Sequence, residues 1–112
     1  MASNLGTFVF HKNITEPSEG NVLIIKRASL LTFTIEGTAT NIDVQFEAQS
    51  HEEGKFIKCF CYSLEGDPKV TTEAKSLNDV HWRIELPSLY SFRVKVNSIS
   101  GGNADIIGTL AG

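Results

Sequence analysis

Apolar and polar residues alternate one by one along most of this chain. In one stretch Leu31, Phe33 and Ile35 are separated by two threonines. Successive side chains of a strand point to opposite faces, so this period of two predicts strands with one face on a core and the other in water. The same period marks four stretches of the sequence, at 31–36, 42–49, 82–86 and 92–97.

Polar breaks that contain glycine or proline separate these strands. Gly54 closes one break and Pro68 another, while Pro87 interrupts strand pairing because proline lacks the N–H that a ladder needs. Gly101 and Gly102 predict a tight hairpin between the last two strands. The resulting map places strands near 5–11, 22–26, 30–36, 42–49, 55–64, 69–74, 80–86, 90–98 and 103–110.

This map predicts the fold class. Short strands with turn signals every 8–12 residues are typical of sandwiches and barrels, and short connections favour antiparallel neighbours. We therefore expect an all-β, single-domain antiparallel β-sandwich, Ig-like or jelly-roll-like, with about eight or nine short strands. A length of 112 residues fits one domain.

The first 29 residues differ from the rest. An apolar beginning with Leu5, Phe8 and Phe10 is followed by a polar stretch over 13–21. Residues 1–29 are interpreted either as an edge strand plus a polar loop or as an arm that docks on a neighbouring chain, because a sheet edge can be covered either way. Leu5, Phe8 and Phe10 are the candidate docking residues, and 30–112 is the sandwich domain.

Charge and composition exclude several classes of partner. The 13 acidic and 10 basic residues give a net charge of −3, without the basic stripe that phosphate contacts require, so no nucleic acid is expected. No apolar run approaches the ~20 residues of a membrane-spanning helix, and no secretory signal is visible, so we expect no membrane partner and synthesis in a cytoplasm.

The candidate catalytic and metal-binding residues do not form a recognisable site. Cys59 and Cys61 are two apart on a predicted strand, where a disulfide would be strained, so they are interpreted as buried thiols. The three histidines His11, His51 and His81 lie in separate segments without zinc spacing. Phosphate-binding and hydrolase motifs are absent, so we expect no enzyme, no cofactor and no metal.

Acidic and aromatic residues leave two further interpretations. Glu52 and Glu53 are interpreted as a solvated hairpin end, because the alternating oxygen ligands of a calcium loop are absent. Trp82 alternates with aliphatic residues and is expected in the core, whereas Tyr62 and Tyr90, near strand ends, could form an exposed sugar-binding platform.

The order of residues over about 30–110 resembles a β-sandwich module of tailed-bacteriophage virion proteins. The similar segments are 42–50, which ends in Phe-Glu-Ala-Gln-Ser, the Phe-Arg-Val-Lys-Val run at 92–96, and the Ser-Gly-Gly turn followed by a last strand at 100–106. The chain departs from that pattern where Gly54 follows two glutamates instead of an aspartate, and where Phe56 replaces a frequent tryptophan.

The resemblance implies a non-enzymatic virion structural protein, such as a capsid decoration, head-fibre, tail or baseplate component. It would be made in the host cytoplasm and then act in the virion by docking in many copies on capsid or tail proteins, as a homo-oligomer. The alternative is a carbohydrate-binding β-sandwich module that attaches to host-surface glycans. An enzyme is the third class considered.

Overall fold

The computed structural model describes residues 4–26, 28–64, 69–77, 80–86 and 89–112. In these ranges the chain forms strands, turns and extended segments and contains no helix. The strands are β1 (Asn4–Ile14), β2 (Leu23–Ile24), β3 (Leu30–Gly37), β4 (Asn41–Gln49), β5 (Ile57–Lys58), β6 (Cys61–Ser63), β7 (Lys69–Thr71), β8 (Glu73–Ala74), β9 (His81–Glu85), β10 (Ser91–Ser100) and β11 (Ala104–Ala111).

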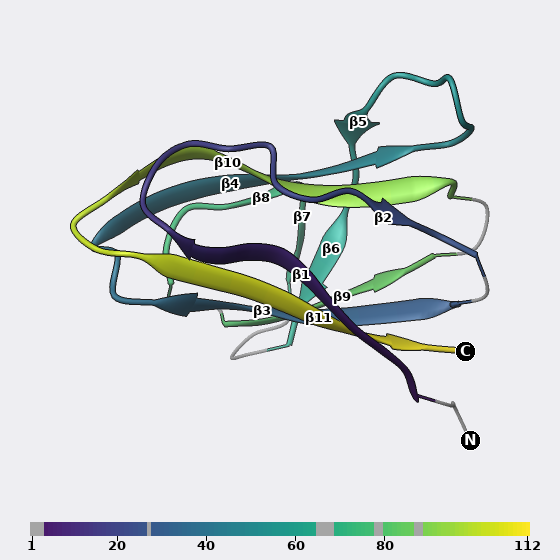
Figure 1. Cartoon of the computed structure of the whole chain (residues 1–112), viewed down its shortest axis with the longest axis horizontal. Helices are drawn as coiled ribbons and strands as arrows, with labels where there is room; N and C mark the ends of the chain where they lie inside the picture. Colours follow the sequence, from purple (N-terminus) through teal and green to yellow (C-terminus); the bar gives the residue numbers. More distant parts are fainter. Residues whose placement is uncertain (1–3, 27, 65–68, 78–79, 87–88) are drawn as a thin grey trace.

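These strands form two antiparallel sheets that lie as layers against each other (Figure 1). The larger sheet has the order β1-β11-β3-β9-β6-β7, and the smaller has β2-β10-β4-β5, with β8 also pairing with β4. The predicted all-β antiparallel sandwich is therefore confirmed. Seven of the nine predicted strands correspond to β1, β2, β3, β4, β9, β10 and β11.

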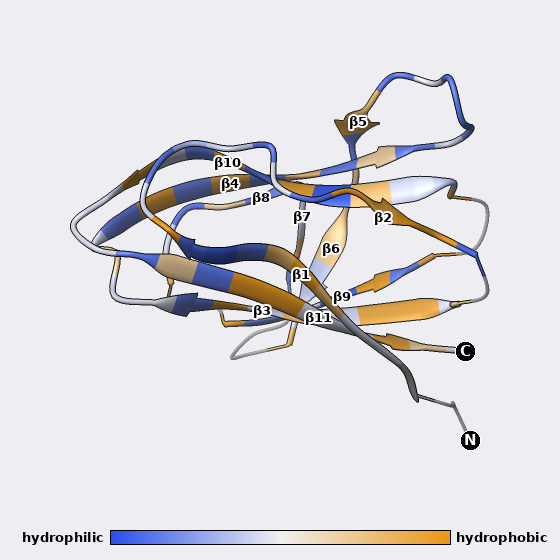
Figure 2. Ribbon diagram, in the orientation of Figure 1, coloured by the Kyte–Doolittle hydropathy of each residue, from blue (hydrophilic) through white to orange (hydrophobic). Residues whose placement is uncertain are grey.

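The core lies between the two sheets and is built from the apolar faces of the alternating strands. Figure 2 shows hydrophobic and hydrophilic residues alternating along β4 and β10. Phe33 of the larger sheet meets Phe46 and Phe92 of the smaller one, with ring centroids 5.6 and 5.9 Å apart. Trp82 is buried against Phe46, as the sequence predicted. Loss of one such ring costs about 3–5 kcal/mol.

The predicted hairpin at residues 100–103 is wrong. β10 pairs with β4 and β2, whereas β11 pairs with β3 and β1, so this turn carries the chain from one sheet to the other (Figure 1). Gly101 and Gly102 both have positive φ, 77° and 148°, which allow the sharp reversal. A Cβ on Gly101 would lie 1.9 Å from Oγ1 of Thr40, so the turn also requires glycine for space.

Two predicted strands are each divided between the sheets. The segment predicted as one strand at 55–64 gives β5, which pairs with β4, and β6, which pairs with β9. The segment at 69–74 likewise gives β7 in the larger sheet and β8 in the smaller. Apolar character alone does not reveal such a crossing, because the apolar run continues through it although Ile57 of β5 is exposed and Cys61 of β6 is buried. The predicted breaks at Pro68 and Pro87 lie outside the described residues.

β1 is an edge strand of the larger sheet in this chain. It pairs with β11 from Asn4 to Ile14, with irregular register at three points. Phe10 is 1% exposed in the core, and Phe8 is half-buried with its ring centroid 4.8 Å from that of Phe10. Leu5 lies within β1, but its side chain is outside the description. Contact of this segment with a neighbouring chain stays a prediction.

Candidate docking surface

Large apolar side chains are exposed together on the β6–β7 hairpin. Phe60, Tyr62 and Leu64 alternate along the chain with buried or half-buried residues and are 64%, 40% and 48% exposed. Val70 of β7 is 51% exposed. We call these four residues the β6–β7 patch. Single exposed apolar residues are common on protein surfaces, but a contiguous group of large ones marks an interaction site.

Strand pairing holds the patch in place. Tyr62 lies directly opposite Val70 on β7 and opposite Arg83 on β9. The N–H of Leu64 donates to the carbonyl of His81, which extends the pairing of β6 with β9 beyond the strand end. The Arg83 guanidinium lies over the Tyr62 ring, 5.6 Å from its centroid. Because β7 is the last strand of its sheet, the patch adjoins an open sheet edge.

The cysteines lie beneath this patch and are both free thiols. Cys61 is fully buried, as predicted, while Cys59 is only half-buried. Burial raises the pKa of the Cys61 thiol well above its ordinary value, and the neighbouring Cys59 raises it further. A nucleophilic cysteine needs the opposite shift, because the thiolate is the reactive form. The arrangement therefore makes Cys61 a packing residue below the exposed rings.

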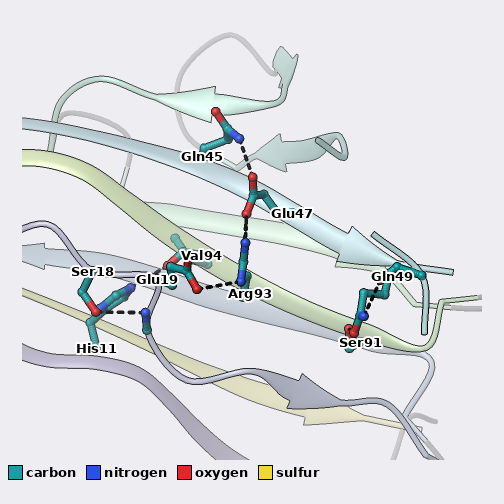
Figure 3. Close-up of polar contacts among 11 residues, drawn as sticks. His11, Ser18, Glu19, Gln45, Glu47, Gln49, Ser91, Arg93 and Val94 are labelled. Atoms are coloured by element: carbon teal, nitrogen blue, oxygen red, sulfur yellow. Dashed lines mark hydrogen bonds and ion pairs between the residues drawn. The ribbon is translucent and has the colours of Figure 1, made fainter. Parts of the chain in front are cut away.

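The acidic residues of the sequence divide into two groups. Glu52 and Glu53 are exposed in the turn after β4, where the sequence placed them. Glu47 is instead buried on the outer side of the smaller sheet and pairs with Arg93 of β10, with Nη2 2.7 Å from Oε1 (Figure 3). Glu47 therefore has a structural role, since both of its carboxylate oxygens accept hydrogen bonds from other side chains.

Arg93 of β10 is the centre of a cluster that joins this strand to three other segments, namely β4, the β1–β2 connection and the β4–β5 connection. Its guanidinium also contacts Glu19 of the β1–β2 connection at 3.1 Å, and the guanidinium carbon lies 3.8 Å from the ring centroid of Phe56. Nε2 of Gln45 donates to the second oxygen of Glu47 at 2.5 Å. We call these five residues the Arg93 cluster. It fixes both connections against the outer face of the smaller sheet.

The three histidines lie on three separate segments and differ in burial. His11 is buried, and its Nε2 donates to the carbonyl of Val94 at 2.5 Å (Figure 3). Burial lowers the pKa of His11, and the bond to Val94 opposes that shift only in part. His51 and His81 are exposed on separate segments. Within the described ranges no three potential ligands come close enough to hold a metal ion.

The predicted aromatic platform is only partly formed. Tyr62 is exposed on the larger sheet, but Tyr90 is half-buried just before β10, where its carbonyl accepts a hydrogen bond from the N–H of Ile25. Tyr62 belongs to the larger sheet, whereas Tyr90 precedes a strand of the smaller sheet. In the part of the chain that the structure describes, no helix is long and apolar enough to cross a membrane.

Comparison with known proteins places the chain in a family. The sequence profile of the XepA family matches residues 4–110, which include all of the strands except the last residue of β11. The chain belongs to the XepA family. The sequence is also similar to that of the SPbeta prophage-derived uncharacterized protein YomS of Bacillus subtilis (strain 168). The two are 26% identical over 98 residues, which cover 85% of this chain and 78% of YomS.

Two solved structures share the fold of this XepA-family chain. The crystal structure of the SPBc2 prophage-derived protein YomS has a TM-score of 0.89 at 21% identity, and the match covers 100% of this chain and 96% of YomS. The crystal structure of the PBSX exported protein XepA also has a TM-score of 0.89, at 22% identity. It matches 99% of this chain but only 38% of XepA, so the XepA-family fold here corresponds to one part of that longer protein.

The β6–β7 patch of this XepA-family chain was missed by the sequence analysis. The run from Phe56 to Tyr62 is apolar at nearly every position, which favoured burial of its side chains apart from Tyr62, the candidate platform residue. The missed signal is the alternation within the run, because Cys59 and Cys61 are smaller than the rings at positions 60 and 62. On a strand these two sets must face opposite ways.

Proposed function

We propose that this protein is a non-enzymatic bacteriophage structural protein that docks in many copies on other virion proteins through the β6–β7 patch. The observation on which the proposal depends is the exposure of Phe60, Tyr62 and Leu64 at alternate positions, with the exposed Val70 directly opposite Tyr62, on the last two strands of the sheet. The prophage origin of YomS and the family relation to XepA support a phage context. The protein is synthesised in the host cytoplasm and incorporated into the particle.

The energetics of the patch favour repeated over single contacts. Complete burial of one large apolar side chain is worth about 1.5–3 kcal/mol, and the patch residues are already about half covered. Covering all four would therefore gain only about 3–6 kcal/mol, whereas association costs about 4–15 kcal/mol. One patch alone binds weakly. When many copies of the protein are held in one array, their weak contacts act together and the overall affinity rises.

The N-terminal strand is not the docking element in this proposal. Phe10 belongs to the core of its own chain, and its removal would leave a cavity between the sheets. An exchanged β1 could still pair with β11 of a second copy, because that pairing is the one that the chain makes with itself. The β6–β7 patch is available without any such rearrangement.

Incorporation into particles tests the proposal. In the strain that encodes the protein, the gene is replaced by a variant with Phe60→Ser and Val70→Thr, particles are induced and purified, and the protein is quantified by mass spectrometry. The expected result is many wild-type copies per particle and at least about a tenfold loss for the variant. The matched control is Val9→Thr, another exposed strand residue, which lies outside the patch.

Two outcomes would overturn the proposal. One is wild-type protein that is absent from purified particles. The other is incorporation of the patch variant at the wild-type level. Circular dichroism and a thermal melt of the purified variant check that the β6–β7 hairpin substitutions leave the fold intact, since both act at exposed positions.

A further inference from the structure

A shallow trough lies on the outer face of the larger sheet, above β3. Its volume is about 220 Å³. The side chains that form it come from β3, β9, β11 and the residue after β6, and they alternate along their strands with buried residues. We call it the β3 trough, and its lining includes Thr32, Thr34, Leu64, His81, Ile107 and Thr109.

Sheet register arranges these residues in two rows across the strands. In the first row Thr109 lies opposite Thr32, and Thr32 lies opposite Arg83, which in turn faces Tyr62. In the second row Ile107 lies opposite Thr34, which lies opposite His81. Neighbouring strands are ~4.8 Å apart, so the first row extends over roughly 14 Å of open sheet.

The side chains that line the trough are suited to bind an uncharged ligand that carries hydroxyl groups. The hydroxyls of Thr32, Thr34 and Thr109 form no hydrogen bond with the described residues and are accessible, so each can donate one bond and accept others. Ile107 and Leu64 add apolar walls. Among the residues that the structure describes, the lining contains no carboxylate and no lysine. Hydroxyl groups between apolar walls match a sugar ring, which has polar edges and apolar C–H faces.

Size and strand pairing argue against other ligands. A peptide cannot add to β3, because β11 and β9 already occupy both of its edges. Ordinary small-molecule pockets measure about 300–1,000 Å³, so the trough is too small to enclose a whole ligand of that size. It suits one unit of a chain that continues along the first row toward Arg83 and Tyr62.

We propose that the β3 trough binds one unit of an oligosaccharide through Thr32, Thr34 and Thr109. This is a binding activity separate from docking. The trough itself shares Leu64 with the β6–β7 patch, and its extension along the first row also reaches Tyr62. A structural protein with such a site would both assemble into a particle and contact a glycan. The four-strand row provides a guanidinium and an aromatic edge beyond the trough, which further sugar units would reach.

A glycan array followed by nuclear magnetic resonance tests the assignment. The full chain is applied to an array of purified oligosaccharides that includes chitohexaose and maltohexaose, and each positive sugar is titrated into isotope-labelled protein. The expected result is binding of at least one oligosaccharide, with the largest amide shifts at residues 32–34 and 107–109. No positive sugar at concentrations up to about 10 mM would overturn the proposal, as would shifts confined to another surface.

Variants of the hydroxyls separate the site from the fold and from docking. Thr32→Val combined with Thr109→Val removes two hydroxyls and keeps β-branched side chains that suit a strand, and affinity is expected to fall about tenfold or more. Thr15→Val, in the exposed β1–β2 connection, is the matched control. The docking variant with Phe60→Ser and Val70→Thr is expected to bind the sugar like wild type. Unchanged affinity of the double threonine variant would refute the assignment.

Discussion

Replacement of Arg93 should expose how strongly the Arg93 cluster stabilises the fold. The Arg93 and Glu47 side chains are 13% and 8% exposed, so the pair is largely removed from solvent screening. Arg93→Met keeps the aliphatic length but leaves the Glu47 carboxylate buried with Gln45 as its remaining partner. Breaking a buried pair in this way costs about 3–5 kcal/mol. Glu19 adds little, because its side chain is 65% exposed.

A double-mutant cycle in urea measures this coupling. The free energy of unfolding is determined for wild type, Arg93→Met, Glu47→Gln and the double variant. Because Glu47→Gln removes the buried negative charge, the double variant should be less destabilised than the sum of the single variants, by about 1–3 kcal/mol. Additive losses, or a loss below about 1 kcal/mol for Arg93→Met, would refute the reasoning that burial makes this pair strong.

Two other features give predictions of their own. The pKa of His11 is lower in the folded chain than the unfolded value of about 6.5. Below about pH 6.5 the unfolded chain therefore binds more protons at this site, and stability decreases as the pH falls, by at most ~1.4 kcal/mol per pH unit. His11→Gln should make the free energy of unfolding depend less on pH in this range. Equal slopes for His11→Gln and wild type would contradict a role of His11. Gly101→Ala should lower the free energy of unfolding by more than about 1 kcal/mol, because φ is +77° and Thr40 occupies the space. A wild-type urea midpoint would contradict this.

The strands could be predicted because their signal is local. Each alternating stretch records which of its residues face the core, and burial in the structure follows the same period, as along β3 from Leu31 to Ile35. The partners of each strand could not be predicted in the same way. Two glycines such as Gly101 and Gly102 are compatible both with a hairpin and with a turn that crosses between sheets. Which of the two forms depends on where the other strands pair.

The candidate surfaces illustrate the same limit. Phe8 and Phe10 form an apolar group at the start of the sequence and were natural docking candidates, yet Phe10 completes the core. Glu47 and Arg93 come together although 46 positions separate them. The β3 trough combines residues of four segments. Such sites arise from pairing between distant strands, and alternation within a single strand carries no record of that pairing.

The position of β11 between β1 and β3 has a consequence for biosynthesis. Asn13 and Asp105, which are hydrogen-bonded across β1 and β11, are 92 residues apart in the chain. At about 5–20 residues per second, a ribosome needs roughly 5–20 s to make the intervening segment. During that interval Phe10 and its neighbours leave the exit tunnel without their final partner. The larger sheet is therefore completed only after translation of β11, and chaperones have that interval in which to act.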